Sequence, residues 1–225
     1  RWTLTESIPT GYHTLSLQFP AGDRLSVHCI VTPKTCFLSD VIQKDEKVWG
    51  PSVQLYALKS KRNWGIGDFT DLETLIEWCA DHGASVLSIN PLHTLFIENP
   101  DHACPYAPAS RQFLNPIYID VEAVPEFQYC DKARNKVFSP EYQAQLQTLR
   151  RNSKVNYKTV MALKRPILEM LYREFHDMHL NSRNRDAVSE RAIAFQKFVR
   201  LGGESLRHLA IFQALQDRFQ TDNPL

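Results

Sequence analysis

The segment Ser52–Val121 constrains the fold of this chain more than any other part of its sequence. It predicts a strand at Val53–Leu58, a polar loop at Lys59–Phe69, a helix, and a second strand at Ser85–Asn90. The first strand is almost entirely apolar, which is typical of a strand buried on both faces. A strand, a helix and a strand within about forty residues predict a right-handed, parallel βαβ unit.

The helix inside this unit carries start and stop signals. Thr70 and Glu73 have the spacing of a capping box, and Gly83 stands where a helix C-cap belongs. Between them, apolar residues recur at helical spacing: Leu72, Leu75, Ile76 and Cys79. We therefore expect one amphipathic helix that begins near Thr70 and ends before Gly83.

A third strand is predicted at Asn115–Val121, after a long loop rich in proline and aromatic residues. Both loops of the segment then leave the carboxyl ends of strands. In barrels of alternating strands and helices, that is the face where chemistry is done. Half of a binding site is therefore expected here.

The sequence before this segment predicts a separate unit. Tyr12–Phe19 and Arg24–Val31 alternate apolar and polar residues on either side of the turn signal Pro20–Asp23, which indicates a hairpin. A lone hairpin is marginally stable, so we expect it to pair with further strands or to pack on a neighbouring domain. Lys34–Val48 is a mixed linker, and the domain boundary is placed near it.

After Val121 the sequence becomes helical in character. Helices are expected at Pro140–Arg150, Tyr157–His179 and Ala187–Phe219, and Gly202-Gly203 is expected to break the last of them. Two apolar stripes are interpreted as core faces. They comprise Leu163, Ile167, Leu168, Leu171 and Phe175, and then Ile193, Phe195, Phe198 and Val199.

Composition excludes several classes of protein. A net charge of +1 and the absence of a basic run argue against nucleic-acid binding. No apolar stretch approaches the roughly eighteen residues of a membrane span, and no signal peptide is apparent. The five cysteines include no C-x-x-C pair, which argues against a disulfide framework and a zinc site and favours a cytoplasmic setting.

Ordered motifs along the central segment carry a family resemblance. They are the run from Asn63 to Phe69 (NWGIGDF), Asp71-Leu72, Asn90-Pro91-Leu92-His93, Pro105-Tyr106-x-Pro108-x-Ser110-Arg111, Leu114-Asn115 and Ile117–Val121. This order and spacing resembles the bacterial 4-α-glucanotransferases, the amylomaltases or disproportionating enzymes of glycoside hydrolase family 77. The resemblance is close through Ile8–Phe127 and weaker through the helical remainder.

The resemblance implies an α/β fold, the first part of a (β/α)8 TIM barrel with a helical insertion. Residues 46–225 would form the start of this barrel, with 139–225 mainly helical. Residues 1–45 would be the last strands of a small β-sandwich domain and the linker. Only about three of the eight strands of a closed barrel are expected here, so the chain is interpreted as an internal fragment of a longer enzyme.

The implied activity is a retaining transfer of an α-1,4-glucan segment to the 4-position of an acceptor sugar, with maltooligosaccharide or starch-type glucan as partner. Such chemistry needs a carboxylate nucleophile and a carboxylic acid about 5 Å apart. In the family these groups follow later barrel strands, so they are expected beyond Leu225 and the fragment alone is expected to be inactive. The family needs no metal or cofactor, and the sequence gives no oligomeric state.

Tyr106 is the principal candidate for a sugar contact. An aromatic ring suits the apolar face of a sugar, and Pro105 and Pro108 stiffen the loop around it. By resemblance, Tyr106 matches a family tyrosine near the sugar at the cleavage point. Cys104 stands where members usually have Ser, so a backbone contact would survive there while a hydroxyl contact would weaken.

The other substrate-binding candidates have structural alternatives. Trp64 either stacks on glucan or seals its loop against the barrel. Asp68 lies either at the helix start as a cap or on the face that binds sugar. Asn115, with Arg111, is expected to fix the aromatic loop through backbone carbonyls, and Asp120 is expected to be a hydrogen-bonding residue at a strand end rather than a sugar contact.

Two further function classes remain open from sequence alone. One is a non-catalytic glucan-binding module that uses the hairpin region and aromatic residues such as Tyr12, Trp64 and Tyr106. The other is a helical interaction domain formed by Pro140–Leu225.

Overall fold

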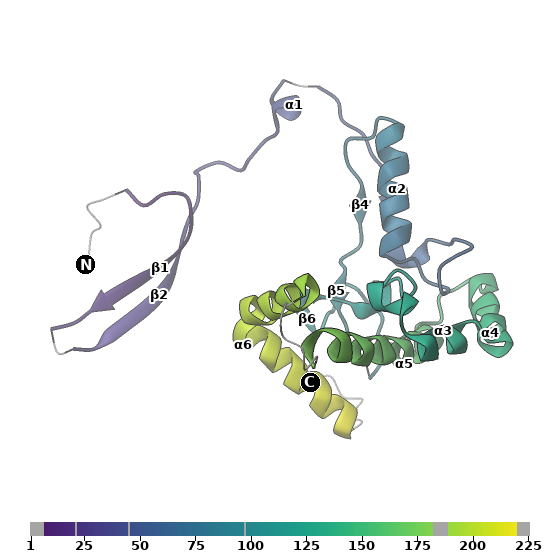
Figure 1. Ribbon diagram of the computed structural model, residues 1–225. Coiled ribbons are helices and arrows are strands. Elements are labelled where there is room, and N and C mark those ends of the chain that lie inside the picture. Colours follow the sequence, from purple (N-terminus) through teal and green to yellow (C-terminus); the bar gives the residue numbers. More distant parts are fainter. Residues whose placement is uncertain (1–6, 21, 45, 97, 182–188, 220–225) are drawn as a thin grey trace. The chain divides into compact units, whose positions relative to one another are not determined.

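The computed structural model describes residues 7–20, 22–44, 46–96, 98–181 and 189–219 (Figure 1). The chain divides into two compact units, Arg1–Val48 and Trp49–Leu225. This division falls at the end of the segment expected to be a linker. Within the described residues, no helix is long and apolar enough to cross a membrane.

The first unit contains the expected hairpin. Strands β1 (Gly11–Gln18) and β2 (Arg24–Val31) pair antiparallel, with Gly11 opposite Val31 and Gln18 opposite Arg24. Many of its large apolar side chains are exposed, including Tyr12 at 86%. A short helix, α1 (Asp40–Gln43), lies in the expected linker, and Ala21 of the turn lies outside the described residues.

The second unit begins with the expected βαβ arrangement. Strands β3 (Ser52–Val53) and β4 (Ser88–Ile89) pair in parallel on either side of helix α2 (Phe69–Asp81). The parallel pairing is confirmed, but the expected strand lengths are wrong, since each strand has two residues. The 3-10 turn η1 (Leu55–Ala57) replaces the end of the first strand.

A side chain explains why the first strand stops. The backbone N–H of Leu55 donates to the Asn90 side-chain oxygen at 2.7 Å instead of to a strand. The backbone of Gly67 also lies against Leu55, because a Cβ atom at Gly67 would meet the Leu55 carbonyl oxygen at 2.0 Å. These contacts turn the chain after two residues of pairing.

The N-cap of helix α2 is Asp68, two residues before the expected cap Thr70. Asp68 and Asp71 form the capping box, each side chain accepting from the other's backbone N–H at 3.0 and 3.1 Å. The Thr70 hydroxyl instead donates to Asp120 Oδ2 at 2.7 Å, so it is not a cap. Gly83, with φ of 75°, follows the last helical turn as expected.

The third strand does not lie where the sequence predicts it, so that prediction is wrong. Strand β6 (Ser110–Leu114) precedes the expected range and pairs antiparallel with β5 (His93–Thr94). The expected range instead contains the 3-10 turn η2 (Pro116–Tyr118). Pro116 cannot donate to a strand ladder, and Asn115 accepts from the Ile117 N–H at 3.0 Å to cap the turn.

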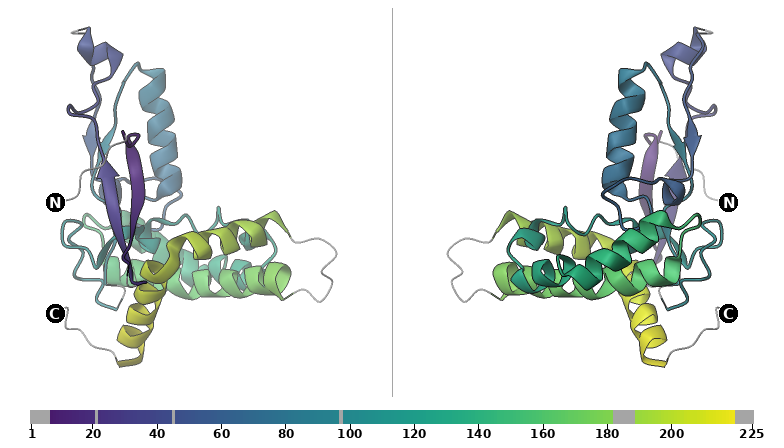
Figure 2. Two further views of the ribbon diagram at one scale, coloured as in Figure 1. Left: turned by 90° about the vertical axis from the view of Figure 1, so that its left-hand side faces the viewer. Right: turned by 90° about the vertical axis from the view of Figure 1, so that its right-hand side faces the viewer.

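The remainder of the chain is helical. It comprises the 3-10 turn η3 (Pro125–Gln128), α3 (Asp131–Val137), α4 (Pro140–Arg151), α5 (Tyr157–Phe175), the π-helical turn η4 (His176–Leu180) and α6 (Glu190–Phe219). The three expected helices are confirmed, although Ala187 lies outside the described residues. Gly203 (φ 49°, ψ −142°) bends α6 as expected, and its two halves point in different directions (Figures 1 and 2).

Of the two expected apolar stripes, only one forms a core face. Along α5, Leu163, Ile167, Leu171 and Phe175 are buried and Leu168 is partly buried. On α6, by contrast, Ile193, Phe198 and Val199 are 45–54% exposed. Phe195 alone of this stripe is half-buried, against Phe175, so the second expectation is wrong for three of its four residues. Only Ala192 and Gln216 are buried on the described length of α6.

Candidate functional site

Arg62 lies among three carboxylates that come from two parts of the chain. Its guanidinium pairs with Asp68 at 2.5 Å, with Asp120 at 2.6 Å and with Asp71 at 3.0 Å. The side chains of the three aspartates are at most 8% exposed, whereas that of Arg62 is 37% exposed. The ion pairs join the loop after β3 to the start of α2 and to the turn after η2.

Electrostatics keep this group charged. Burial acts to lower the pKa of Arg62, but the hydrogen bond and charge of Asp68, with the charges of Asp120 and Asp71, raise it overall. Arg62 is therefore a permanent cation at the centre of these ion pairs.

Lys164 supplies a second cation beneath the same turn. Its side chain is buried, and Nζ donates to the carbonyl oxygens of Ile117 at 2.7 Å and Ile119 at 2.8 Å. Burial lowers the pKa of Lys164 to about 8, although the charges of Asp68 and Asp120 act in the opposite direction. The lysine thus holds the turn after η2 from the α5 side.

The loop after β3 is also fixed to α4. Arg150 donates to the carbonyl oxygens of Asn63 at 2.7 Å and Arg62 at 2.9 Å. Gly65 has φ of 84°, and a Cβ atom there would lie 2.6 Å from Leu149 Cβ. Both the backbone conformation and the close approach to α4 therefore require glycine at this position.

Trp64 forms part of this closure. Its side chain is 2% exposed, its ring centroid lies 5.5 Å from that of Tyr142, and Nε1 donates to Glu122 Oε1 at 3.0 Å. The ring therefore has no open face on which a sugar could stack. Of the two interpretations of Trp64, the structure agrees with the one in which the ring seals its loop.

Asp68 and Asn115 also act within the protein in this structure. Asp68 is 1% exposed, and its side chain caps α2 and pairs with Arg62. Asn115 caps η2 through a backbone N–H, not through the carbonyl contacts expected from sequence. Asp120, which accepts from Arg62, Thr70 and the Glu122 N–H, has the hydrogen-bonding role expected of it.

Tyr106 stands out on the loop between β5 and β6. We refer to residues 98–109 as the aromatic loop. The Tyr106 side chain is 65% exposed, Cys104 is exposed and Pro105 is half-buried. The Ala107 N–H donates to the Cys104 carbonyl at 3.2 Å, and the Ala109 N–H donates to the Thr94 carbonyl at 3.0 Å. The loop is thus a turned segment that presents an aromatic ring outward.

A polar cavity of about 540 Å³ lies beside the aromatic loop. Its lining consists of Asp101, Ala103 and the connection between α4 and α5, namely Asn152, Ser153, Lys154, Val155, Asn156 and Tyr157. Burial raises the pKa of Tyr157 to about 12, so its hydroxyl stays protonated. Carboxylate, amide and hydroxyl groups of this kind can form hydrogen bonds with sugar hydroxyls.

The two histidines of this region show no arrangement for metal binding. His93 lies in β5, and the His102 ring stacks on Phe96 with centroids 5.3 Å apart. Among the residues that the structure describes, no group of three or more His, Cys, Asp or Glu side chains could hold a metal ion.

Comparison with known proteins assigns the family. The family profile described as 4-alpha-glucanotransferase matches residues 53–224, which include both loops and the helices that follow. The chain belongs to the 4-alpha-glucanotransferase family. The match extends through the helical region, beyond the part where the sequence motifs are closest.

Individual relatives agree with this membership. The chain is 37% identical over 216 residues to 4-alpha-glucanotransferase of Haemophilus influenzae, covering 96% of this chain and 30% of that protein. It is 32% identical over 233 residues to 4-alpha-glucanotransferase of Mycobacterium tuberculosis, covering 98% and 29%. The crystal structure of amylomaltase from Corynebacterium glutamicum matches with a TM-score of 0.79 and 29% identity, covering 98% of this chain and 30% of that one. The chain thus spans about 30% of the length of these 4-alpha-glucanotransferases.

Sequence reasoning did not identify Arg62 or Lys164. For Arg62 the sequence holds no usable signal, because two of its partners belong to a helix start and the third lies 58 positions away. For Lys164 the sequence does hold a signal, because this residue lies at helical spacing between Val160 and Ile167, inside the apolar stripe of α5. A lysine within such a stripe indicates a buried cation with dedicated acceptors.

Proposed function

We propose that this chain is part of a 4-α-glucanotransferase that cleaves an α-1,4-glucan and transfers the released segment to the 4-position of another sugar. The observation that carries the proposal is the family match over residues 53–224. This match includes the helical region, which favours the enzyme over a hairpin-based binding module or a separate helical interaction domain.

The second part of the proposal concerns architecture. Residues 46–225 form the start of a (β/α)8 barrel with a mainly helical region at 139–225, and residues 1–45 are the end of a β-sandwich-like domain with its linker. The parallel β3–α2–β4 unit supports this, as does the likeness to a solved amylomaltase. The free cysteines support a cytoplasmic location, and the family match supports maltodextrins as substrates.

In this proposal the chain supplies substrate binding, and the nucleophile and the acid/base belong to sequence C-terminal to Leu225. Retaining transfer needs two carboxyl groups about 5 Å apart, one of them able to donate a proton. Asp68, Asp71 and Asp120 are poor candidates, because each is nearly buried and paired with Arg62. Their role is to fix the loop Lys59–Phe69, which in this proposal forms the binding face together with the aromatic loop.

Tyr106 is the residue of this chain proposed to touch glucan. Its ring is exposed, and the polar cavity beside the aromatic loop offers hydrogen-bonding groups. Pro105 limits the freedom of the loop, and Cys104 contributes through its backbone. Trp64, Asp68 and Asn115 do not touch the sugar in this proposal. Their contacts within the protein hold the neighbouring turns in place.

The test uses the full-length enzyme that contains this chain, incubated with maltotriose. Transfer converts the substrate into glucose and a ladder of longer maltooligosaccharides, which chromatography resolves. A full-length enzyme that forms no longer oligosaccharide from maltotriose would rule out the proposed function.

A further inference from the structure

Arg165, on α5, joins three carboxylates from three segments of the chain. Its guanidinium pairs with Glu98 of the aromatic loop at 2.6 Å, with Glu169 of α5 at 3.0 Å and with Asp217 of α6 at 3.0 Å. Only the Glu169 contact lies within one helix. The other two ion pairs therefore link the aromatic loop to the second half of α6 through one side chain.

A cavity and one aromatic contact accompany this link. A cavity of about 760 Å³ opens between α5 and the second half of α6, and Glu98, Arg165, Glu169 and Asp217 are among its lining residues. Phe96 provides a further contact, since its ring stacks on His102 at 5.3 Å and meets Phe212 edge-on at 6.4 Å. The Arg165 ion pairs and the Phe96–Phe212 contact thus both link this part of the chain to α6.

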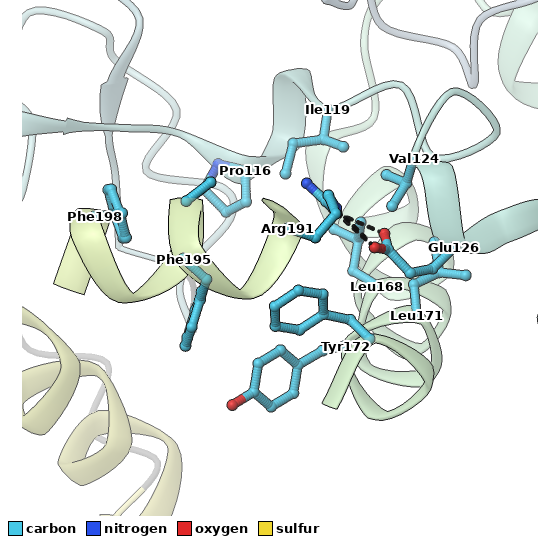
Figure 3. A pocket seen from close by; sticks show the side chains of 12 residues that line it. Pro116, Ile119, Val124, Glu126, Leu168, Leu171, Tyr172, Arg191, Phe195 and Phe198 are labelled. Atoms are coloured by element: carbon cyan, nitrogen blue, oxygen red, sulfur yellow. Dashed lines mark hydrogen bonds and ion pairs between the residues drawn. The ribbon is translucent and has the colours of Figure 1, made fainter. Parts of the chain in front are cut away.

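The two halves of α6 are held by different residues. In the first half, Arg191 binds buried Glu126 through two nitrogens, at 2.7 to 2.9 Å (Figure 3). Its guanidinium carbon lies 5.4 Å from the Phe175 ring centroid. Gly203 then redirects the helix, and the second half meets Arg165 through Asp217. Because the first half is fixed to η3, the bend brings Asp217 to a defined place.

We propose that Arg165 is a positioning residue for glucan binding, which holds the aromatic loop through Glu98 and is itself held by Asp217. The inference rests on the proposed function, in which Tyr106 of this loop contacts the sugar. With the bridge intact, the loop is ordered before substrate arrives, so binding does not bear the full entropy cost of ordering it. The bridge does not touch the reacting atoms, so it acts on substrate binding and not on the chemical step.

The chain offers a matched control. Glu169 binds the same guanidinium at the same 3.0 Å as Asp217, but it lies on α5 with Arg165 and does not cross to another segment. Glu98→Gln and Asp217→Asn each break a link between segments and keep the side-chain size. Glu169→Gln removes an equal charge without breaking a link between segments.

The experiment compares these three variants in the full-length enzyme. With maltotriose, Glu98→Gln and Asp217→Asn are expected to raise KM about threefold to tenfold and to leave kcat within about twofold, while Glu169→Gln changes neither. Hydrogen–deuterium exchange of residues 98–109 is expected to rise in the first two variants only. In a Tyr106→Ala background, Glu98→Gln is expected to add no further increase in KM.

The outcomes distinguish a failure of the proposed function from a failure of the positioning role of Arg165. A wild-type enzyme without transfer activity would overturn the proposed function and, with it, the role of Arg165 in that function. An active wild-type enzyme in which Glu98→Gln and Glu169→Gln behave alike, in KM and in loop exchange, would overturn the positioning role alone.

Discussion

Arg62 and Asp120 lie 58 positions apart in the sequence and form an ion pair of 2.6 Å. This contact joins the loop after β3 to the turn after η2. Asp120 also accepts from the Thr70 hydroxyl at 2.7 Å, so the start of α2 is included in the same junction. The geometry of the candidate binding face therefore depends on a cluster of ion pairs as well as on the apolar core.

Removing the cation of this cluster should be costly. Arg62→Met leaves Asp68, Asp71 and Asp120 as nearly buried carboxylates without their shared partner. We expect the free energy of unfolding to fall by about 3 kcal/mol, the cost of leaving a buried charge unpaired. Urea unfolding of the full-length enzyme, followed by tryptophan fluorescence, measures this change.

The matched control is Arg134→Met. Arg134 pairs with Asp131 at 3.6 Å in an exposed contact within α3. Exposed pairs contribute little, so a change below about 0.5 kcal/mol is expected. Equal effects of the two substitutions would contradict a structural role for the Arg62 cluster.

Gly65 is predicted to tolerate no side chain. Gly65→Ala places a Cβ atom 2.6 Å from Leu149 Cβ and forces a left-handed backbone conformation, at an expected cost of about 3 kcal/mol. Gly83→Ala is the control, since Gly83 also has positive φ but its Cβ would meet no atom within 4 Å. For Gly83→Ala we expect the free energy of unfolding to fall by about 1 kcal/mol, the cost of the left-handed backbone conformation alone. Thermal unfolding of both variants tests the difference, and similar losses would argue against close packing of the loop on α4.

Local signals predicted the elements whose cause is local. The β1–β2 hairpin, the parallel β3–β4 pairing and helices α4 to α6 follow from turn residues and apolar periodicity. The two-residue length of β3 does not, because it depends on the Asn90 side chain binding the Leu55 N–H from 35 positions away. The cap of α2 was displaced for a similar reason, since the Thr70 hydroxyl is used by Asp120.

The candidate site divides in the same way. Tyr106 was identified from its chemistry and its prolines, and the structure places it in the open. Trp64 carries the same aromatic chemistry, but its contacts with Tyr142 and Glu122 bury it, and these partners are distant in sequence. Burial is a tertiary property, so the sequence alone leaves both interpretations of Trp64 open.

Lys164 should make stability depend on pH in a specific window. Its folded-state pKa of about 8 lies below the ordinary 10.5, so below pH 8 both the folded and unfolded states hold the proton. Between pH 8 and 10.5 the unfolded state holds more protons, and stability therefore rises with pH, by about 3 kcal/mol at most. Below pH 8 the buried charge lowers stability by the same amount.

The substitution Lys164→Met isolates this contribution. The stability of the wild type relative to Lys164→Met is expected to increase between pH 8 and 10.5 and to stay level from pH 6 to 8. Urea midpoints of both proteins across this range give the comparison. A constant difference between them would show that Lys164 titrates normally.

Tyr106→Ala is expected to lower kcat/KM for maltotriose about tenfold, because it removes an aromatic contact with the sugar ring. Unfolding stability should hardly change, since the side chain is 65% exposed. Tyr129→Ala serves as the control, as Tyr129 is 58% exposed but lies after η3 and not on the aromatic loop. Initial rates over a range of maltotriose concentrations test both variants, and equal losses would remove Tyr106 from the binding face.

The most direct test of the central claim follows the fate of an acceptor sugar. The full-length enzyme is incubated with unlabelled maltotriose and ¹³C-labelled glucose, and the products are examined by NMR and mass spectrometry. Transfer places the label at the reducing end of longer oligosaccharides through new α-1,4 linkages, and this is the expected result. Release of unlabelled glucose and maltose without any labelled oligosaccharide would show hydrolysis instead of transfer and would contradict the proposed function.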